Sequence, residues 1–120
     1  MIGRLYSTVL ETRDPHALAR FYSEVTGLPI TRDTDDWVTI GDGVRKVAFQ
    51  LAPGHLPPAF PDPSSSMQLH LDIEVDDIAE AEPKVLALGA KRLDGEGHDF
   101  RVYADPDGHP FCLVWHAGTP

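Results

Sequence analysis

The sequence is short of basic charge and of cysteine. Its 120 residues include ten Lys and Arg against nineteen Asp and Glu, which gives a formal net charge of −9, and no run of basic residues occurs. Proteins bind phosphate backbones and anionic membranes through clustered Lys and Arg, so we expect no nucleic-acid partner and no membrane partner. The single cysteine, Cys112, excludes an internal disulfide and a cysteine-rich zinc cage.

Long apolar runs are also lacking. The opening residues, MIGRLYSTVL, contain neither the apolar stretch of a secretory signal nor a membrane span. The length fits one domain with a single ordinary core. We therefore expect a cytoplasmic globular protein.

A first helix is predicted between residues 14 and 27. Asp14 is a suitable N-cap, Pro15 suits the first helical position, and Gly27 suits the left-handed residue after the helix. Apolar residues at i, i+3, i+4 and i+7 form a stripe on one helical face. These are Leu18, Phe21, Tyr22 and Val25.

The second half of the chain repeats this plan between residues 76 and 89. Asp76 is predicted to cap the helix and Gly89 to end it. Pro83 lies inside this segment and removes a hydrogen bond, so we expect a kink there or a helix that is regular only beyond it. The apolar stripe consists of Ile78, Ala81, Val85 and Leu88.

Strand-like segments surround both helices, so each half reads as β-α-β-β-β. This pattern predicts an α+β fold in one domain, residues 1–120, made of a module at 1–52, a proline-rich linker at 53–66 that acts as a stiff spacer, and a module at 67–120. The expected strands are Arg4 to Thr12, Trp37 to Ile40, Lys46 to Ala52, Met67 to Val75, Ala90 to Leu93, Phe100 to Ala104 and Phe111 to His116.

Alternation along the strands separates an apolar face from a polar one. From residue 67 to 75, the apolar set is predicted to face the helix, while Gln68, His70, Asp72 and Glu74 point the other way. In the last strand, Cys112 lies on the face away from the helix. A concave sheet would make this polar face a pocket, whereas a flat one would leave it an ordinary solvated surface, and both alternatives stay open.

Several segments resemble the vicinal oxygen chelate superfamily, which includes glyoxalase I, extradiol dioxygenases, fosfomycin-resistance enzymes and bleomycin-binding proteins. They are FYSEVTGL, QLHLDIEVDDI, LALGA and ADPDGHPFCLVW, together with the paired βαβββ modules. The similarity covers essentially the whole chain and is greatest to the small single-domain glyoxalase-like group. It implies two modules forming a curved mixed sheet with a concave cup, helices on the convex face, and a homodimer.

Catalytic members of that superfamily hold a divalent metal in the cup with His and Glu side chains from four strands. The resemblance places those four positions at Ser7, Gln50, His70 and Cys112. Only His70 is a residue that catalytic members commonly use, and the other three suit neither zinc nor magnesium well. We therefore expect no metal and no other cofactor, unless a shifted register brings in Glu11 or Asp72.

The candidate site combines these positions with their neighbours on the polar face. His70 is the candidate catalytic residue, as a general base or as a hydrogen-bond partner of a ligand. Cys112 is either a nucleophile or, more simply, a small apolar side chain, and Asp72 either orients His70 or is merely solvated. The predicted ligand-binding residues are Ser7, Val9, Trp37, Gln50, Gln68, Asp72 and Cys112.

Three functions are compatible with this site. The first is a protein that binds a small organic molecule in the cup without a metal, either to sequester it or to process it by acid–base chemistry. The alternative is a metal-dependent lyase, isomerase or dioxygenase that uses His70, Cys112 and a carboxylate from Glu11 or Asp72. In the third, the cup is collapsed or serves only as a dimer surface.

Overall fold

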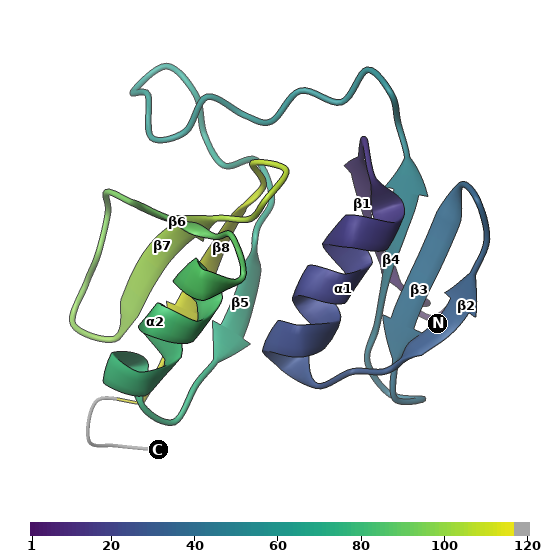
Figure 1. Ribbon diagram of the computed structural model, residues 1–120, viewed down its shortest axis with the longest axis horizontal. Helices are drawn as coiled ribbons and strands as arrows, with labels where there is room; N and C mark the ends of the chain where they lie inside the picture. The colour runs from purple at the N-terminus through teal and green to yellow at the C-terminus, as the bar shows by residue number, and fades with distance from the viewer. Residues whose placement is uncertain (117–120) are drawn as a thin grey trace. The chain divides into compact units, whose positions relative to one another are not determined.

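The computed structural model describes residues 1–116 and divides into two compact units, the N-terminal unit Met1–His55 and the C-terminal unit Leu56–Pro120 (Figure 1). Each unit has the order β-α-β-β-β and its own four-stranded mixed sheet, so the predicted α+β class and tandem modules are confirmed. The N-terminal unit contains β1 (Thr8–Thr12), α1 (Pro15–Thr26), β2 (Ile30–Asp33), β3 (Trp37–Gly41) and β4 (Lys46–Leu51). The C-terminal unit contains β5 (Leu71–Glu74), α2 (Ile78–Ala87), β6 (Lys91–Leu93), β7 (Phe100–Ala104) and β8 (Pro110–Val114).

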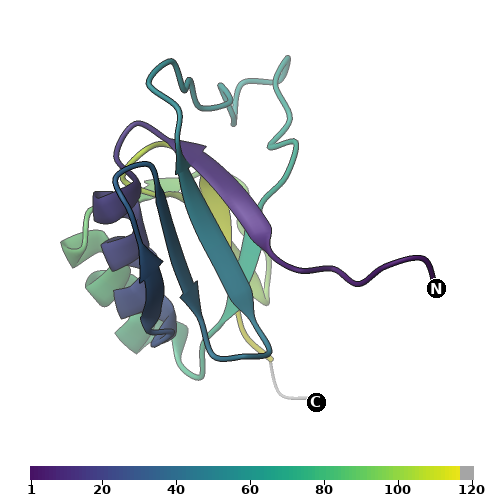
Figure 2. The same cartoon turned by 90° about the vertical axis from the view of Figure 1, so that its right-hand side faces the viewer.

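The two sheets share one topology. The strand order is β1-β4-β3-β2 in the N-terminal unit and β5-β8-β7-β6 in the C-terminal unit. Strand β1 lies parallel to β4, and β5 lies parallel to β8. All other neighbouring strands are antiparallel. Figure 2 shows this order in the N-terminal unit, with the segment before β1 leading away from the sheet.

Helix α1 forms as the sequence predicts. The Asp14 carboxylate accepts the Ala17 N–H at 3.0 Å, and Gly27 adopts φ +75° and donates its N–H to the Ser23 carbonyl at 2.8 Å. The apolar stripe packs on the sheet, where Tyr22 stacks on Phe49 with ring centroids 5.7 Å apart. The core of this unit is made of Leu18, Ala19, Phe21, Tyr22, Val38, Ile40 and Phe49.

Helix α2 departs from the prediction at its start. Asp77, not Asp76, caps it by accepting the Ala79 N–H at 2.9 Å. The helix ends at Ala87 with Leu88 at the C-cap, and Gly89 follows with φ +110°, as predicted for the residue that ends the helix. Leu88, which was predicted to belong to the apolar stripe, is exposed. Pro83 lies inside the helix, which begins five residues before it and is therefore not confined to the residues beyond the proline.

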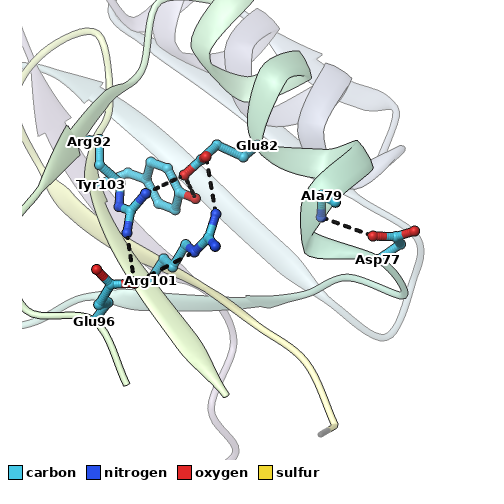
Figure 3. A network of polar contacts seen from close by, with 7 residues as sticks. All are labelled: Asp77, Ala79, Glu82, Arg92, Glu96, Arg101 and Tyr103. Atoms are coloured by element: carbon cyan, nitrogen blue, oxygen red, sulfur yellow. Dashed lines mark hydrogen bonds and ion pairs between the residues drawn. The ribbon is translucent and has the colours of Figure 1, made fainter. Parts of the chain in front are cut away.

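A polar network joins α2 to its sheet (Figure 3). Glu82 accepts hydrogen bonds from the Tyr103 hydroxyl and from Arg92, both at 2.7 Å, and from Arg101 at 3.1 Å. Arg92 also pairs with Glu96 at 3.1 Å. The Tyr103 hydrogen bond and the two guanidinium charges lower the pKa of Glu82, so this carboxyl stays ionised well into the acid range.

Two predicted strands begin later than expected, and one ends earlier. The strand expected from Arg4 begins at Thr8, and the one expected from Met67 begins at Leu71. The second is delayed because Gln68 adopts φ +63° and the Leu69 N–H bonds to the Met67 carbonyl at 2.7 Å, a tight turn that breaks the extended chain. The last strand likewise ends at Val114 and not at His116.

The proline-rich segment 53–66 is built from turns and is not a simple extended spacer. The Asp62 N–H bonds to the Ala59 carbonyl at 2.8 Å, and the Ser65 N–H bonds to the Asp62 carbonyl at 2.9 Å. The Asp62 carboxylate also accepts the N–H and the hydroxyl of Ser64. The two units meet in the chain between His55 and Leu56, within this segment.

Candidate functional site

The strongest candidate site lies on the face of the C-terminal sheet that α2 does not cover. In β8, Phe111 and Leu113 are fully buried on the helix side, where Phe111 stacks on Tyr103. Cys112 therefore points to the opposite face. Its register partner on the parallel strand β5 is Asp72, so the two side chains lie side by side.

His70 completes a three-residue cluster with these side chains. It lies just before β5, and its Nε2 is 3.1 Å from an Asp72 oxygen. One donor atom from each of His70, Asp72 and Cys112 lies within 4.8 Å of the other two. Two ligands of a single ion, each about 2.0–2.3 Å from it, are separated by at most about 4.6 Å, so a small adjustment would let all three reach one zinc-sized ion.

The thiol of Cys112 is protonated at neutral pH. Burial raises its pKa to about 11, with further contributions from the Asp72 charge and from a hydrogen bond to Asp72. The side chain is also nearly inaccessible, with 4% of the residue exposed. Since the thiolate is the nucleophilic form, the geometry favours the interpretation of Cys112 as a small, weakly polar side chain over that of a nucleophile.

The cluster lies in a pocket of about 460 Å³, which we call the C-terminal pocket. Its apolar walls include Met67, Phe100 and Val114, and Phe100 is the register partner of Val114. The remaining lining residues are His70, Asp72, Asp99, Cys112, Trp115 and His116.

Sequence reasoning found the polar floor of this pocket but missed much of its wall. Alternation along β7 places Phe100 on the same face as Val102, which is the register partner of Cys112, but Phe100 was not among the predicted site residues. Met67 lies before the turn at Gln68, where alternation gives no information. Trp115 follows the end of β8, and its ring lies 5.9 Å from the Arg101 guanidinium. Gln68 was predicted to bind the ligand, but its left-handed backbone takes it out of the strand and it does not line the pocket.

The other predicted residues belong to the N-terminal unit. Ser7 and Trp37 line a second pocket of about 220 Å³, the N-terminal pocket. Gln50 is the register partner of both Trp37 and Glu11, and Val9 pairs with Ala48, which also lines this pocket. Gln50 and Val9 thus lie on the same sheet face without lining the pocket. That residues of both units surround one cup stays a prediction.

Histidines outside the cluster form separate pairs. His16 binds Asp33 at 2.8 Å, and His116 pairs with Glu74. His109 is largely buried, and its Nδ1 lies 3.0 Å from a carboxylate oxygen of the fully buried Asp105 side chain. Asp105 also accepts the N–H groups of Asp107 and His109, so it organises the β7–β8 turn around Gly108.

The chain belongs to the glyoxalase-like domain family, whose sequence model matches residues 7–114. This match confirms the resemblance to the vicinal oxygen chelate superfamily. The matched residues cover most of both units, including the proline-rich segment 53–66. No curated protein sequence matches the chain.

Solved structures share the fold at low sequence identity. A glyoxalase/bleomycin resistance protein/dioxygenase family enzyme from Burkholderia phytofirmans has a TM-score of 0.76 and 18% identity, over 94% of this chain and 98% of that one. The fosfomycin resistance protein FosX from Mesorhizobium loti has a TM-score of 0.72 and 18% identity, over 98% and 96%. FosX from Listeria monocytogenes has a TM-score of 0.73 and 13% identity, over 98% and 97%.

No helix in residues 1–116 is long and apolar enough to cross a membrane.

Proposed function

We propose that this protein binds a small organic molecule in the C-terminal pocket, without a catalytic metal, and either sequesters it or processes it by acid–base chemistry. One observation carries the proposal: His70, Asp72 and Cys112 meet on the floor of a pocket whose wall includes Met67, Phe100 and Val114. A few convergent polar groups among apolar side chains are typical of ligand sites, and about 460 Å³ holds a molecule of metabolite or antibiotic size.

His70 is the residue best placed for proton transfer. The Asp72 carboxylate accepts a hydrogen bond from Nε2–H, which fixes the tautomer and leaves Nδ1 as a hydrogen-bond acceptor. Within residues 1–116, the Asp72 carboxylate is the polar partner found for this ring. The Nδ1 atom is therefore available to take a proton from, or accept a hydrogen bond from, a bound molecule.

The test measures ligand-induced stabilisation of the full chain. Fosfomycin, the compound after which two of its structural neighbours are named, is titrated in the presence of EDTA and followed by melting temperature and calorimetry. We expect fosfomycin, or a compound that native mass spectrometry finds bound after purification, to stabilise the protein. His70→Ala and Asp72→Asn should each weaken that binding about tenfold, the value of one or two lost hydrogen bonds.

The matched control is His16→Ala, which removes a similar histidine–aspartate pair from the N-terminal unit. This variant should bind as tightly as the wild type. Equal binding by His70→Ala and the wild type would show that the C-terminal pocket is not the site.

A second candidate is a divalent-metal site, because the three donor atoms of the cluster lie close enough for one ion. His70, Asp72 and Cys112 would hold a borderline-soft ion such as Zn²⁺, which when bound would supply a Lewis acid. Binding a metal there would break the contact between His70 and Asp72. It would also require the buried Cys112 thiol to lose its proton, which its raised pKa opposes.

Elemental analysis of protein purified without chelator separates the two candidates. One equivalent of metal that is lost in both His70→Ala and Cys112→Ser would establish the metal site and contradict the metal-free proposal. The metal-free proposal would be supported if the protein stays free of metal after incubation with Zn²⁺, Co²⁺ or Mn²⁺ and still binds the organic compound.

We also propose that the protein is a cytoplasmic homodimer, in line with the family resemblance. Light scattering checks the oligomeric state directly. A mass equal to that of one 120-residue chain would contradict the dimer.

A further inference from the structure

The N-terminal pocket has an unusual concentration of positive charge for so acidic a protein. Arg32 and Lys46 both line it, and no carboxylate side chain does. The C-terminal pocket has the opposite balance, since Asp72 and Asp99 line it and no Lys or Arg does. The two units repeat one fold, yet their pockets carry charges of opposite sign.

Both cations lie against aromatic rings. The Lys46 Nζ is 3.5 Å from the centroid of the Tyr6 ring, and the Arg32 guanidinium carbon is 5.7 Å from the centroid of the Trp37 ring. A hydrogen bond with Lys46 lowers the pKa of Tyr6 most, and the positive charges of Lys46 and Arg32 lower it further. Both cations therefore lie close enough to Tyr6 to affect the same side chain. In the part of the chain that the structure describes, the aromatic rings are the partners of these two cations, and neither has a carboxylate within ion-pairing distance.

The remaining lining residues give the pocket a fixed floor and further hydrogen-bonding groups. The Trp37 indole N–H donates to the Thr39 hydroxyl at 3.0 Å, which holds the ring against the sheet. Thr39 pairs with Ala48 on the neighbouring strand, and both are buried. Ser7 adds a hydroxyl at the start of β1.

We propose that the N-terminal pocket binds the anionic group of a small aromatic acid, with Arg32 and Lys46 holding a carboxylate or phosphonate and Trp37 stacking on the ring. The volume of about 220 Å³ suits a molecule with one ring and one acidic group. Guanidinium and ammonium groups bind such oxyanions through charge-assisted hydrogen bonds, and an indole face accepts a flat ring. The residues that carry this proposal all belong to the N-terminal unit, and the proposal does not depend on the function proposed for His70.

The test uses benzoate and phenylphosphonate as probes, with benzamide and benzylamine as a neutral and a cationic comparison of the same shape. Trp115→Phe leaves Trp37 as the single tryptophan, so its fluorescence reports on the N-terminal pocket. Calorimetry on the wild-type chain checks the same affinities. We expect the two anions to quench Trp37 and to bind about tenfold more tightly than benzamide, and their affinity to fall as salt is added.

Arg32→Gln and Lys46→Met should each weaken benzoate binding about tenfold, whereas Lys91→Met, which removes an exposed lysine from β6, should not change it. Equal affinity for benzoate and benzamide, or full affinity in the Arg32 and Lys46 variants, would overturn the proposal. Neither result bears on whether the C-terminal pocket binds fosfomycin or another compound.

Discussion

Asp72 acts on two neighbours at once. Its carboxylate accepts a hydrogen bond from His70 Nε2, and its charge and a second hydrogen bond help to keep the Cys112 thiol protonated. Asp72→Asn should therefore lower the pKa of Cys112 below about 11, because the negative charge that opposes thiolate formation is removed. With a single cysteine in the chain, thiolate absorbance followed against pH measures this pKa without interference from another thiol.

The control for this measurement is Glu74→Gln, which removes another exposed carboxylate from the same strand. It should leave the Cys112 titration where it is in the wild type. A Cys112 pKa that stays at about 11 in Asp72→Asn would show that burial alone is responsible.

At the scale of residues, the sequence predicts the polar part of the site better than its walls. Period-two alternation places Asp72 and Cys112 on the same face, and the parallel register of β5 and β8 then makes them neighbours. The contact between His70 and Asp72 depends on where β5 begins, and the left-handed Gln68 that sets this point has no clear signature in the sequence. Whether the N-terminal and C-terminal residues serve one site depends on how the units pack, which alternation does not encode.

At the scale of elements, Glu82 is the main polar link between α2 and its sheet. Glu82→Gln removes the charge that pairs with Arg92 and Arg101, so we expect the free energy of unfolding to fall by about 1–3 kcal/mol. Glu80→Gln, on the exposed side of the same helix, should change it by less than about 0.5 kcal/mol. Denaturant titration of the two variants makes the comparison.

The same carboxyl predicts a pH dependence. Its pKa is lower in the folded protein, so the folded state binds the proton less readily than the unfolded chain does. The contribution of Glu82 to stability is therefore complete above the unfolded pKa of about 4.3 and is lost as the pH falls through the folded pKa. Acidification should narrow the difference in melting temperature between the wild type and Glu82→Gln, and a difference that stays constant would contradict this account.

The β7–β8 turn makes a prediction of its own. Gly108 has φ +93°, and a Cβ added there would lie 2.6 Å from the Pro57 Cβ, whereas at Gly89, with φ +110°, the nearest atom would be a Pro106 carbon at 3.4 Å. Gly108→Ala should destabilise the protein more than Gly89→Ala, because it adds a clash to the same backbone strain. Melting temperatures of the two variants decide the point, and equal losses would mean that the contact with Pro57 yields easily.

The elements themselves were largely predictable because local chemistry specifies them. Helix α1 has a cap, a proline at its first position and a terminal glycine that all agree with its apolar stripe, and its bounds came out as expected. Helix α2 offers two adjacent candidates for the cap, Asp76 and Asp77, and an internal proline, so its start was predicted one residue early. The network around Glu82 was not predicted, since it joins residues from three elements that only the folded unit brings together.

At the scale of the whole molecule, the net charge of −9 is a source of self-repulsion. Salt screens such repulsion over about 10 Å at 0.1 M, so raising the ionic strength from low to physiological values should increase the melting temperature by a few degrees. Calorimetric scans at several NaCl concentrations measure this. A decrease would mean that attractive pairs, the Glu82 network foremost, outweigh the repulsion.

The parallel pairing of β1 with β4, and of β5 with β8, also affects how the chain folds during its synthesis. On the ribosome, β1 emerges about 40 residues before its partner β4, and β5 precedes β8 by a similar interval. Until the partner arrives, the early strand of each unit presents an unsatisfied hydrogen-bonding edge to its surroundings. Nascent chains halted before Lys46 or before Pro110 should therefore need chaperone protection, which the completed unit no longer requires.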